Sequence, residues 1–478
     1  MNNRTWSRIS ELTRQPYTPL LLMGVITLFA TVLRFYKLGE WSFWYDEIFT
    51  LRSLGSLSGL PILGQRLSFV LTYFAVEELG ISEWSARLVP ALIGILTIVI
   101  LYFPIKSIFG TFVALFSSAL LAVAPWHVYW SQNARFYTAL LLFYTLALIF
   151  LYLGFEKDRP LYLILGLLFF TLSVRERLFA FFLVPVIAGY VFFLWVLPFQ
   201  KPAGLRWRNL LLLIIPSLLG GIYYSLRYIR DPSLWSSGFG WLNNNPFWLL
   251  SGITFYIGLP IICIGMVGGI LLLLQRSRVG LLLVLAAVVP ILAMMAISLV
   301  QYAANRYAFI TLTSWIILAA VAVRELFLRT RGEARLVAVG VVLILLIVPL
   351  SENALYYQYQ SGNRDNWKAA YAFIRDSKEP GDLVIASEPL LGDYYLKDKV
   401  TRNIFGVDPE QLALEGKRIW FVVDNNVGDK YPEKMKWIKE NSQLIEVYDV
   451  HVRARNFILR VYLFDPADPG LSLKRGTR

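Results

Sequence analysis

Long apolar runs separated by short charged segments dominate the first 351 positions of the chain. A bilayer core of about 30 Å needs about 20 apolar residues per helix, and most of the runs approach that length. The pattern predicts about eleven transmembrane helices. One pair, 160–174 and 178–198, can alternatively be read as a broken or re-entrant element. The predicted spans are 18–37, 86–105, 108–126, 136–154, 160–174, 178–198, 209–226, 247–274, 279–300, 307–327 and 335–351.

Two of the segments between these runs are long and differ from ordinary short loops. Residues 38–85 contain an apolar stretch, Leu67–Phe74, that is too short to cross a bilayer and is soon followed by Glu77 and Glu78. This pattern predicts a pair of amphipathic helices that lie at the membrane interface. The second segment, 227–246, is rich in Trp, Gly and Asn and is typical of an ordered or closing loop.

After residue 351 the pattern changes to short alternating elements. It predicts helices over 366–374 and near 431–440, and strands over 383–386, 418–423, 443–449 and 456–464. Such alternation is typical of a small α/β domain. The predicted fold class is therefore a polytopic α-helical membrane protein. Its transmembrane domain comprises 1–351, and its small C-terminal α/β domain comprises 352–470.

Composition and charge support a membrane location and suggest an orientation. The chain is 57% hydrophobic with a mean hydropathy of +0.57, whereas soluble domains are about 45–50% apolar. Residues 1–351 carry 26 Lys+Arg against 13 Asp+Glu, and 352–478 carry 19 of each, so the membrane part holds the whole +13 surplus. The positive-inside rule favours a cytoplasmic N-terminus, and eleven spans then place the C-terminal domain outside. The first apolar run continues to Leu38 without a small-residue cleavage site, which is typical of an uncleaved span.

The strongest candidate for chemistry is an acidic pair directly after the first span. Asp46 and Glu47 follow the aromatic stretch Trp41–Tyr45 at the predicted membrane surface. On a helix, neighbouring side chains point about 100° apart. One carboxylate can therefore reach a reacting group as a general base while the other meets an arginine or a metal. The alternative is an acidic helix N-terminus stabilised by the helix dipole.

Several arginines fall on the same predicted outer face. Arg135 lies beside Tyr137 at the entrance to the fourth span, and Arg306 lies beside Tyr307 at another outer helix entrance. Arginines in this setting can hold a phosphate by charge-assisted hydrogen bonds. The alternatives are interface anchors, contacts with lipid headgroups and, for the cluster around Glu176, an internal ion-pair network. The joint placement of the groups predicts one cavity, to which the candidate substrate-binding residues are assigned: Arg52, Arg66, Arg87, Arg135, Tyr137, Arg175, Arg177, Arg306 and Tyr307.

These motifs together resemble the GT-C glycosyltransferases. The similarity is to the branch that holds the protein O-mannosyltransferases and the bacterial aminoarabinose and Rgt-type lipopolysaccharide transferases. Each motif is short, but their order along the chain is similar to that branch. The stretches that carry the resemblance are Phe43–Glu47, Ser82–Leu88, Gln132–Tyr137, Arg306–Tyr307, Trp367–Ile374 and Pro380–Asp382.

The resemblance implies an inverting transfer of a sugar from a polyprenyl-phosphate donor to a hydroxyl acceptor at the outer face of the membrane. It implies that Asp46 is the base, that Glu47 orients the acceptor or an arginine, and that arginines stabilise the leaving phosphate. The acceptor would be a lipid, a glycan or a protein, with no nucleic acid involved. The implied location is a bacterial-type inner membrane, with the C-terminal domain periplasmic.

One motif departs from the pattern of the resemblance. Relatives carry a His-Pro-Pro or Lys-Pro-Pro element late in the first outer loop, whereas this chain reads Gly64–Phe69, with Arg66 as the candidate basic residue.

The resemblance leaves the cofactor requirement open. Branches of the superfamily differ in metal dependence, so no cofactor is implied with certainty, and a divalent cation stays an alternative. The single cysteine, Cys263, and two histidines could not form a metal site rich in these residues, so a cation would need carboxylates.

A transporter or flippase for polyprenyl lipids or glycolipids is the main alternative function. Transporters place ionisable residues near the bilayer midplane and contain inverted repeats. Here most spans lack internal charge, and the polar clusters gather at one face, which favours chemistry at the interface. A third hypothesis, a binding module on a membrane anchor, does not explain so many spans.

Overall fold

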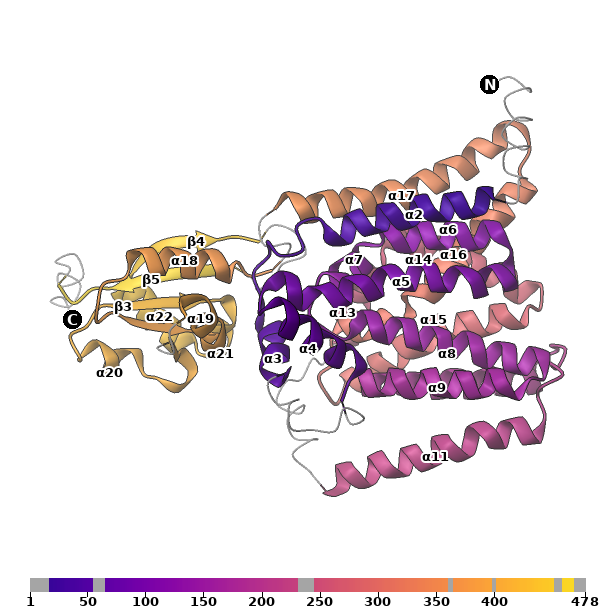
Figure 1. The fold of residues 1–478 in the computed structure, drawn as a ribbon, viewed down its shortest axis with the longest axis horizontal. Coiled ribbons are helices and arrows are strands. Elements are labelled where there is room, and N and C mark those ends of the chain that lie inside the picture. Colours follow the sequence, from indigo (N-terminus) through magenta and orange to yellow (C-terminus); the bar gives the residue numbers. More distant parts are fainter. Residues whose placement is uncertain are drawn as a thin grey trace. The chain divides into compact units, whose positions relative to one another are not determined.

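The computed structural model describes residues 17–54, 65–230, 245–359, 364–397, 401–450 and 458–467 (Figure 1). The chain divides into two compact units. The first unit comprises Met1–Tyr36, Leu63–Leu71 and Val89–Ser351, and the second comprises Lys37–Ile62, Thr72–Leu88 and Glu352–Arg478. The first outer loop thus contributes mainly to the same unit as the C-terminal domain.

The described residues contain seven helices that are long and apolar enough to cross a membrane, or up to nine if two bent pairs each count as one span. This confirms the predicted fold class of a polytopic helical membrane protein. Each predicted apolar run is helical, but α9 (Pro160–Glu176) has only 17 residues, and in α11 (Trp207–Arg230) the apolar stretch found among the described residues is Trp207–Tyr223. The seven are α2 (Thr18–Phe35), α5 (Glu83–Phe109), α8 (Tyr137–Lys157), η3 with α10 (Leu178–Val196), α15 (Arg278–Ser298), η4 with α16 (Asn305–Arg329) and η5 with α17 (Gly332–Gln358).

The two bent pairs have local causes in the sequence. Helix α6 (Thr111–Val123) meets α7 (Pro125–Ser131) at 61°, and α13 (Pro246–Ile257) meets α14 (Leu259–Leu274) at 93°. Pro125 and Pro260 lie in the first turn of the helix after each break, where proline is well tolerated. Gly258 has φ +98°, a conformation that other residues rarely adopt. The prediction of one continuous span over 247–274 was therefore wrong at Gly258.

Burial within the helices separates central from peripheral elements. The buried share of the apolar stretch is 83% in α8 and 89% in Asn305–Arg329. In α2 only 17% of the apolar stretch is buried. Glycines allow close approach in the centre. A side chain at Gly268 of α14 would collide with the backbone oxygen of Leu318 in α16. Such small-residue contacts are a usual means of packing helices in a membrane, because lipid offers no hydrophobic drive for their association.

The second unit is built around a five-stranded sheet with the order β2-β1-β3-β5-β4. Strand β1 is parallel to β2 and β3, whereas β5 is antiparallel to β3 and β4. All five residues of β3 are buried, as expected for a central strand. The strands are β1 (Leu383–Ala386), β2 (Thr401–Asn403), β3 (Ile419–Val423), β4 (Gln443–Tyr448) and β5 (Leu459–Phe464).

Helices cover this sheet and complete its apolar core. Ile438 and Met435 of α22 pack with Phe421 and Ile419 of β3. Short helices begin at prolines or Asx caps, as at Asp408, whose side chain accepts a hydrogen bond from the Glu410 amide. The helices of the C-terminal region are α18 (Trp367–Ser377), α19 (Pro389–Leu396), η7 (Ile404–Gly406), α20 (Pro409–Ala413), α21 (Asn425–Lys430) and α22 (Pro432–Asn441).

The predicted elements of the two long outer segments have separate outcomes. The first contains helices α3 (Tyr45–Leu54) and α4 (Leu67–Leu79), in agreement with a predicted helix pair. In the second, α11 continues to Arg230, so the predicted loop begins later than 227. Its remaining core, 231–244, lies outside the described residues.

Candidate functional site

The acidic pair lies in the first turn of α3, and its two members have different surroundings. The Glu47 and Ile48 amides both donate to the carbonyl of Trp44, which begins the helix. Glu47 is fully buried, whereas Asp46 is half-buried. The backbone thus directs one carboxylate into the interior of the unit and leaves the other closer to its surface.

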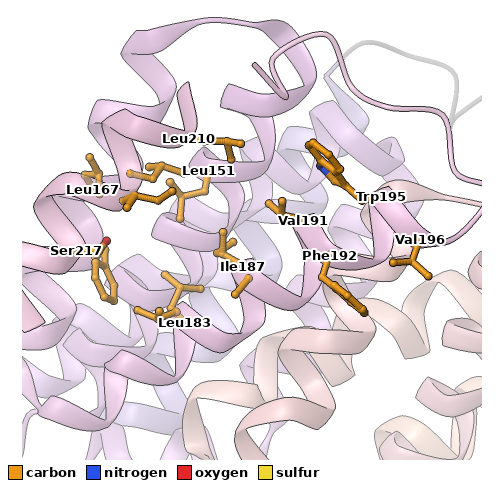
Figure 2. A pocket seen from close by; sticks show the side chains of 15 residues that line it. Leu151, Leu167, Leu183, Ile187, Val191, Phe192, Trp195, Val196, Leu210 and Ser217 are labelled. Atoms are coloured by element: carbon orange, nitrogen blue, oxygen red, sulfur yellow. The ribbon is translucent and has the colours of Figure 1, made fainter. Parts of the chain in front are cut away.

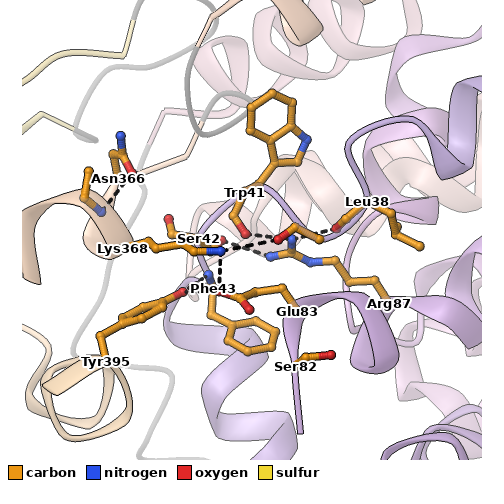
Figure 3. A network of polar contacts seen from close by, with 12 residues as sticks. Leu38, Trp41, Ser42, Phe43, Ser82, Glu83, Arg87, Asn366, Lys368 and Tyr395 are labelled. Atoms are coloured by element: carbon orange, nitrogen blue, oxygen red, sulfur yellow. Dashed lines mark hydrogen bonds and ion pairs between the residues drawn. The ribbon is translucent and has the colours of Figure 1, made fainter. Parts of the chain in front are cut away.

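Glu47 forms a buried ion pair with Arg87 of α5. The Nε and Nη2 atoms of Arg87 donate to the two Glu47 carboxylate oxygens, each at 2.8 Å. Figure 3 shows Arg87 beside Leu38, Trp41 and Ser42. Its remaining donors reach the backbone carbonyls of Leu38, Trp41 and Ser42 at 2.8–3.1 Å. A guanidinium has five N–H donors, and all five are used here. In this structure Arg87 is 0% exposed and saturated by its own loop, which gives it a positioning role, and its predicted contact with substrate stays a prediction.

The same ion pair limits the chemical roles that are open to Glu47. Arg87 binds both of its oxygens, and Arg364 lies near the second at 3.7 Å. A carboxylate whose two oxygens are both held by a guanidinium is poorly placed to exchange protons with a substrate. We therefore assign Glu47 to positioning the first loop, and of the predicted catalytic pair only Asp46 stays a candidate base.

A second set of contacts fixes the backbone just before Asp46. The Phe43 amide donates to the Tyr395 hydroxyl at 2.7 Å, and this hydroxyl donates to Glu83 at 3.0 Å. Lys368 lies 3.4 Å from the same Glu83 carboxylate (Figure 3). In addition, the Ser42 hydroxyl donates to the Asp365 carbonyl at 2.5 Å. The loop is thus tied to residues that lie more than 300 positions away in the chain.

The motif Ser82–Leu88 forms the start of α5 and aims Arg87 inward. The Ser82 hydroxyl accepts from the Ser85 amide, and the Ser85 hydroxyl accepts from the Ser82 amide, both at 3.1 Å. This reciprocal arrangement satisfies amides that a helix N-terminus otherwise leaves unpaired. Arg87 follows about one helical turn after this cap, so the cap fixes the direction in which the Arg87 side chain leaves α5.

Three of the predicted arginines gather in the first unit around one aromatic ring. The guanidinium carbons of Arg66, Arg135 and Arg177 lie 4.9, 5.1 and 5.8 Å from the centre of the Phe136 ring. Burial, followed by the charges of Arg177 and Arg135, lowers the pKa of Arg66 to about 10. Three cations held this close favour an anion between them. We call Arg66, Arg135 and Arg177 the arginine cluster.

Glu176 and Arg175 support the arginine cluster from α9. The buried Glu176 carboxylate accepts from the backbone amide and the hydroxyl of Ser68, at 3.0 and 2.5 Å. Arg175 donates to the Gln65 carbonyl at 2.8 Å. These contacts hold the chain before and after Arg66, at Gln65 and Ser68, where α4 begins. In this structure Arg175 donates to a backbone carbonyl of the chain itself, and its predicted role in substrate binding stays a prediction.

Tyr137, Arg306 and Tyr307 lie in an aromatic group next to the cluster. Tyr137 is buried against Trp130, with ring centres 3.9 Å apart. Phe179 stacks on Tyr307 at 4.8 Å and also contacts Tyr137. Arg306 is half-buried beside Tyr307 in η4. The structure therefore brings three predicted groups together within the first unit. They are Arg135 with Tyr137, Arg175 with Arg177, and Arg306 with Tyr307.

The bend between α6 and α7 is held by a buried network that sequence reasoning missed. Arg34 of α2 donates to the carbonyls of Leu121 and Ala122, which end α6, and its Nη2 lies 2.7 Å from His127 Nδ1. In return, Gln132 after α7 donates to the carbonyls of Arg34 and Tyr36 at the end of α2. Each segment thus caps the other and fixes the stretch that leads to Arg135.

The first unit also contains an apolar cavity of about 620 Å³ between α8, α9, α10 and α11 (Figure 2). Leu183 and Val196 of α10 line it, together with Phe170, Trp195 and Leu210. No charged residue lines it, and none of the predicted site residues does. Its composition suits a hydrocarbon chain.

The remaining predictions have the following outcomes. Arg52 is exposed in the last turn of α3. Asp46 belongs to the second unit and the arginine cluster to the first, so their convergence on one cavity stays a prediction. Across the described part of the chain, no three His, Cys, Asp or Glu side chains are arranged to hold a metal ion.

Comparisons with known proteins agree on the fold. Residues 68–219 match the family model described as dolichyl-phosphate-mannose-protein mannosyltransferase. ArnT from Cupriavidus metallidurans, solved with undecaprenyl phosphate bound, is 15% identical with a TM-score of 0.55, covering 94% of this chain and 98% of its own. The apo oligosaccharyltransferase of Archaeoglobus fulgidus is 13% identical with a TM-score of 0.57, covering 94% of this chain and 77% of its own. No curated protein sequence matches the chain significantly.

The chain therefore has the fold of these solved membrane proteins, and residues 68–219 match the mannosyltransferase family model. This segment includes the N-terminus of α5, Arg135 and the Arg175–Arg177 stretch.

Proposed function

We propose that the chain is an inverting glycosyltransferase that moves a sugar from a polyprenyl-phosphate donor to a hydroxyl group of an acceptor. The observation that carries the proposal is the arginine cluster. Three guanidinium groups around Phe136 form a setting for the phosphate of a donor lipid, whose negative charge grows as the sugar leaves.

The apolar cavity supports a lipid donor. Arg177 directly precedes η3 (Leu178–Phe182), and the cavity lining begins at Leu183 and follows α10 to Val196. A phosphate at Arg177 would thus leave its hydrocarbon tail at one end of this cavity. That a protein of similar fold has been solved with undecaprenyl phosphate favours the same class of lipid here.

In the proposed reaction, Asp46 accepts the proton of the acceptor hydroxyl. The hydroxyl oxygen then forms a bond to the anomeric carbon of the sugar while the bond from that carbon to the phosphate oxygen breaks. The electron pair leaves with the lipid phosphate, where the arginine cluster binds it. Glu47 and Arg87 hold the loop that presents Asp46.

The proposed setting is the outer face of a bacterial-type inner membrane, with the C-terminal domain periplasmic. It rests on the charge bias of the loops between the spans. The acceptor would approach from that side, and the donor would enter sideways from the lipid.

The test uses the purified full-length protein in lipid nanodiscs with a panel of polyprenyl-phosphate hexoses and pentoses, scored for hydrolysis and for transfer. We expect turnover of at least one donor. Arg135→Ala should lower kcat/KM for that donor by about 10- to 100-fold, because it removes a charge-assisted contact to phosphate. Arg375→Ala is the matched control, since Arg375 is an exposed arginine of α18.

Two outcomes would count against the proposal. Transfer that is equally fast in Arg135→Ala and wild type would remove the arginine cluster from donor binding. Movement of an intact lipid-linked sugar across the bilayer, with no cleavage of any donor, would favour the flippase hypothesis instead.

A further inference from the structure

The carboxyl ends of two adjacent parallel strands in the second unit meet at a point where the chain changes direction across the sheet. From β1 the chain passes through α19 to β2 on one side, and it then returns to β3 on the other side of β1. Ala386 of β1 pairs with Val422 of β3, so the residues that follow the two strands are neighbours. In open α/β sheets, ligands bind outside the carboxyl ends of the strands at such a switch point.

Acidic side chains occupy this position. Glu388 follows β1 and precedes α19, and Asp424 follows β3 and caps α21. Asp424 is buried, with 4% of its surface exposed, and Glu388 is half-buried. Asp365, just before α18, is close enough for its charge interactions with both to be significant. We call Asp365, Glu388 and Asp424 the strand-end acidic cluster.

The electrostatics of the cluster show that its members repel one another. Burial, then the charge of Asp424, raises the pKa of Glu388 to about 8, while Lys430 acts in the opposite direction. Burial and the charges of Asp424 and Glu388 also raise the pKa of Asp365 well above its ordinary value. Asp424 and Asp365 already accept hydrogen bonds from Asn426 and Trp367, so the half-buried Glu388 is the member that a ligand would use most directly.

A buried tyrosine provides a second and independent indication of a ligand. Tyr371 is 0% exposed, and among the described residues its hydroxyl has no hydrogen-bond partner. The hydroxyl lies close enough to the carboxylates of Glu388 and Asp393 for their charges to raise its pKa further than burial alone does. The ring is fixed by stacking on Trp367 and Tyr395, with centres 6.0 and 6.3 Å apart. A buried hydroxyl without a partner has lost its hydrogen bonds to water with nothing in return, so it needs an explanation.

The cluster is also electrostatically coupled to the proposed base. The charge of Asp46 is among the causes of the raised pKa of Glu388. Tyr395, which stacks on Tyr371, accepts the hydrogen bond from the Phe43 amide three residues before Asp46. A ligand bound at Glu388 would therefore lie near the carboxylate that is proposed to activate an acceptor hydroxyl.

We propose that the strand-end acidic cluster, with Tyr371, is the acceptor subsite and binds the hydroxyl groups of a carbohydrate. The proposal rests on the proposed glycosyltransferase function and deepens it. Carboxylates accept hydrogen bonds from sugar hydroxyls, and the Tyr371 hydroxyl can donate to or accept from another. A neutral polyol also adds no charge to a buried site.

The test is a donor-free titration of the full-length protein in nanodiscs with methyl hexosides and methyl pentosides, followed by saturation-transfer NMR. Glu388→Gln and Tyr371→Phe should each weaken binding about tenfold, the equivalent of about 1.4 kcal/mol. Glu446→Gln, a change at an exposed glutamate of β4, should leave binding unchanged. A further readout is the melting temperature. Tyr371→Phe should keep or raise it, because the variant loses an unsatisfied hydroxyl, whereas a purely structural role would lower it.

The outcomes separate the subsite from the overall function. Equal glycoside affinity in wild type and Glu388→Gln, or no glycoside binding by wild type, would overturn the subsite. So would a loss of Mg²⁺ or Ca²⁺ binding in Glu388→Gln with glycoside binding unchanged, which would indicate a cation site. A protein that binds glycosides through Glu388 but transfers no sugar from any donor would contradict the glycosyltransferase function and leave the subsite standing.

Discussion

At the scale of single residues, Asp46 and Glu47 illustrate how adjacent carboxylates acquire different roles. A helix separates their side chains by about 100°. Glu47 turns inward, where Arg87 binds both of its oxygens, and Asp46 stays half-buried. The buried pair positions the loop, and its neighbour is left for chemistry.

The Glu47–Arg87 pair is expected to contribute strongly to stability. Arg87→Ala should lower the free energy of unfolding of the second unit by about 3–5 kcal/mol, because it leaves Glu47 buried without its main partner. Arg87→Lys should not rescue it, since one ammonium cannot replace five N–H donors. Thermal unfolding followed by tryptophan fluorescence measures the effect.

The control for this prediction is Arg375→Ala. Arg375 is exposed, and its contact with Asp376 is at the surface, so its removal should cost little. If both variants unfold at the same temperature as wild type, the buried pair does not stabilise the loop.

Glu388 predicts a pH dependence of stability. Its pKa is about 8 in the folded protein and near 4.5 when unfolded. Between these values the folded state binds more protons, so stability should fall as the pH rises from about 4.5 to about 8. Other titratable or charged groups also face Glu388: Asp424, Lys430, Asp46, Asp365 and Tyr371. The contribution of Glu388 is therefore isolated by comparing wild type with a variant that changes Glu388 alone.

Glu388→Gln removes this titration without a change of shape. The melting temperature of the variant should depend less on pH than that of wild type across the same window, and it should exceed the wild-type value near pH 8.5. Parallel curves for the two proteins would show that Glu388 does not carry the effect.

At the scale of elements, the N-terminus of α5 connects a sequence motif to the placement of Arg87. Ser82→Ala should cost about 0.5–2 kcal/mol of stability, because it removes the side chain that caps the Ser85 amide. Ser107→Ala near the other end of α5, where the hydroxyl is exposed, serves as the control. Equal melting temperatures for wild type and Ser82→Ala would mean that the cap is dispensable.

The elements that could be predicted from the sequence are those with a strong local signal. Strand β1 follows a Pro-Gly-Asp turn and β3 is continuously apolar, and both were predicted within a residue of their limits. Strand β2 was missed, because Thr401–Asn403 is short and polar and is a strand only through its pairing with β1. The break at Gly258 was missed because the hydropathy of the run continues across it.

At the scale of the whole molecule, the sequence could predict the fold class but only part of the candidate site. The aromatic and basic motifs mark Asp46 and Arg135 locally. Glu388 and Asp424 carry no local mark, because their significance arises only when the sheet brings two strand ends together. The positioning role of Arg87 could not be predicted for the same reason, since the carbonyls that saturate it lie 45 or more positions away.

The central claim is that Asp46 activates an acceptor hydroxyl. The most direct test is sugar transfer by Asp46→Asn from the polyprenyl-phosphate donor that wild type uses, with folding checked by thermal unfolding. The account predicts a loss of about 10²–10⁴-fold in kcat at an unchanged melting temperature, as expected when a general base is removed. Transfer by Asp46→Asn at the wild-type rate would contradict it.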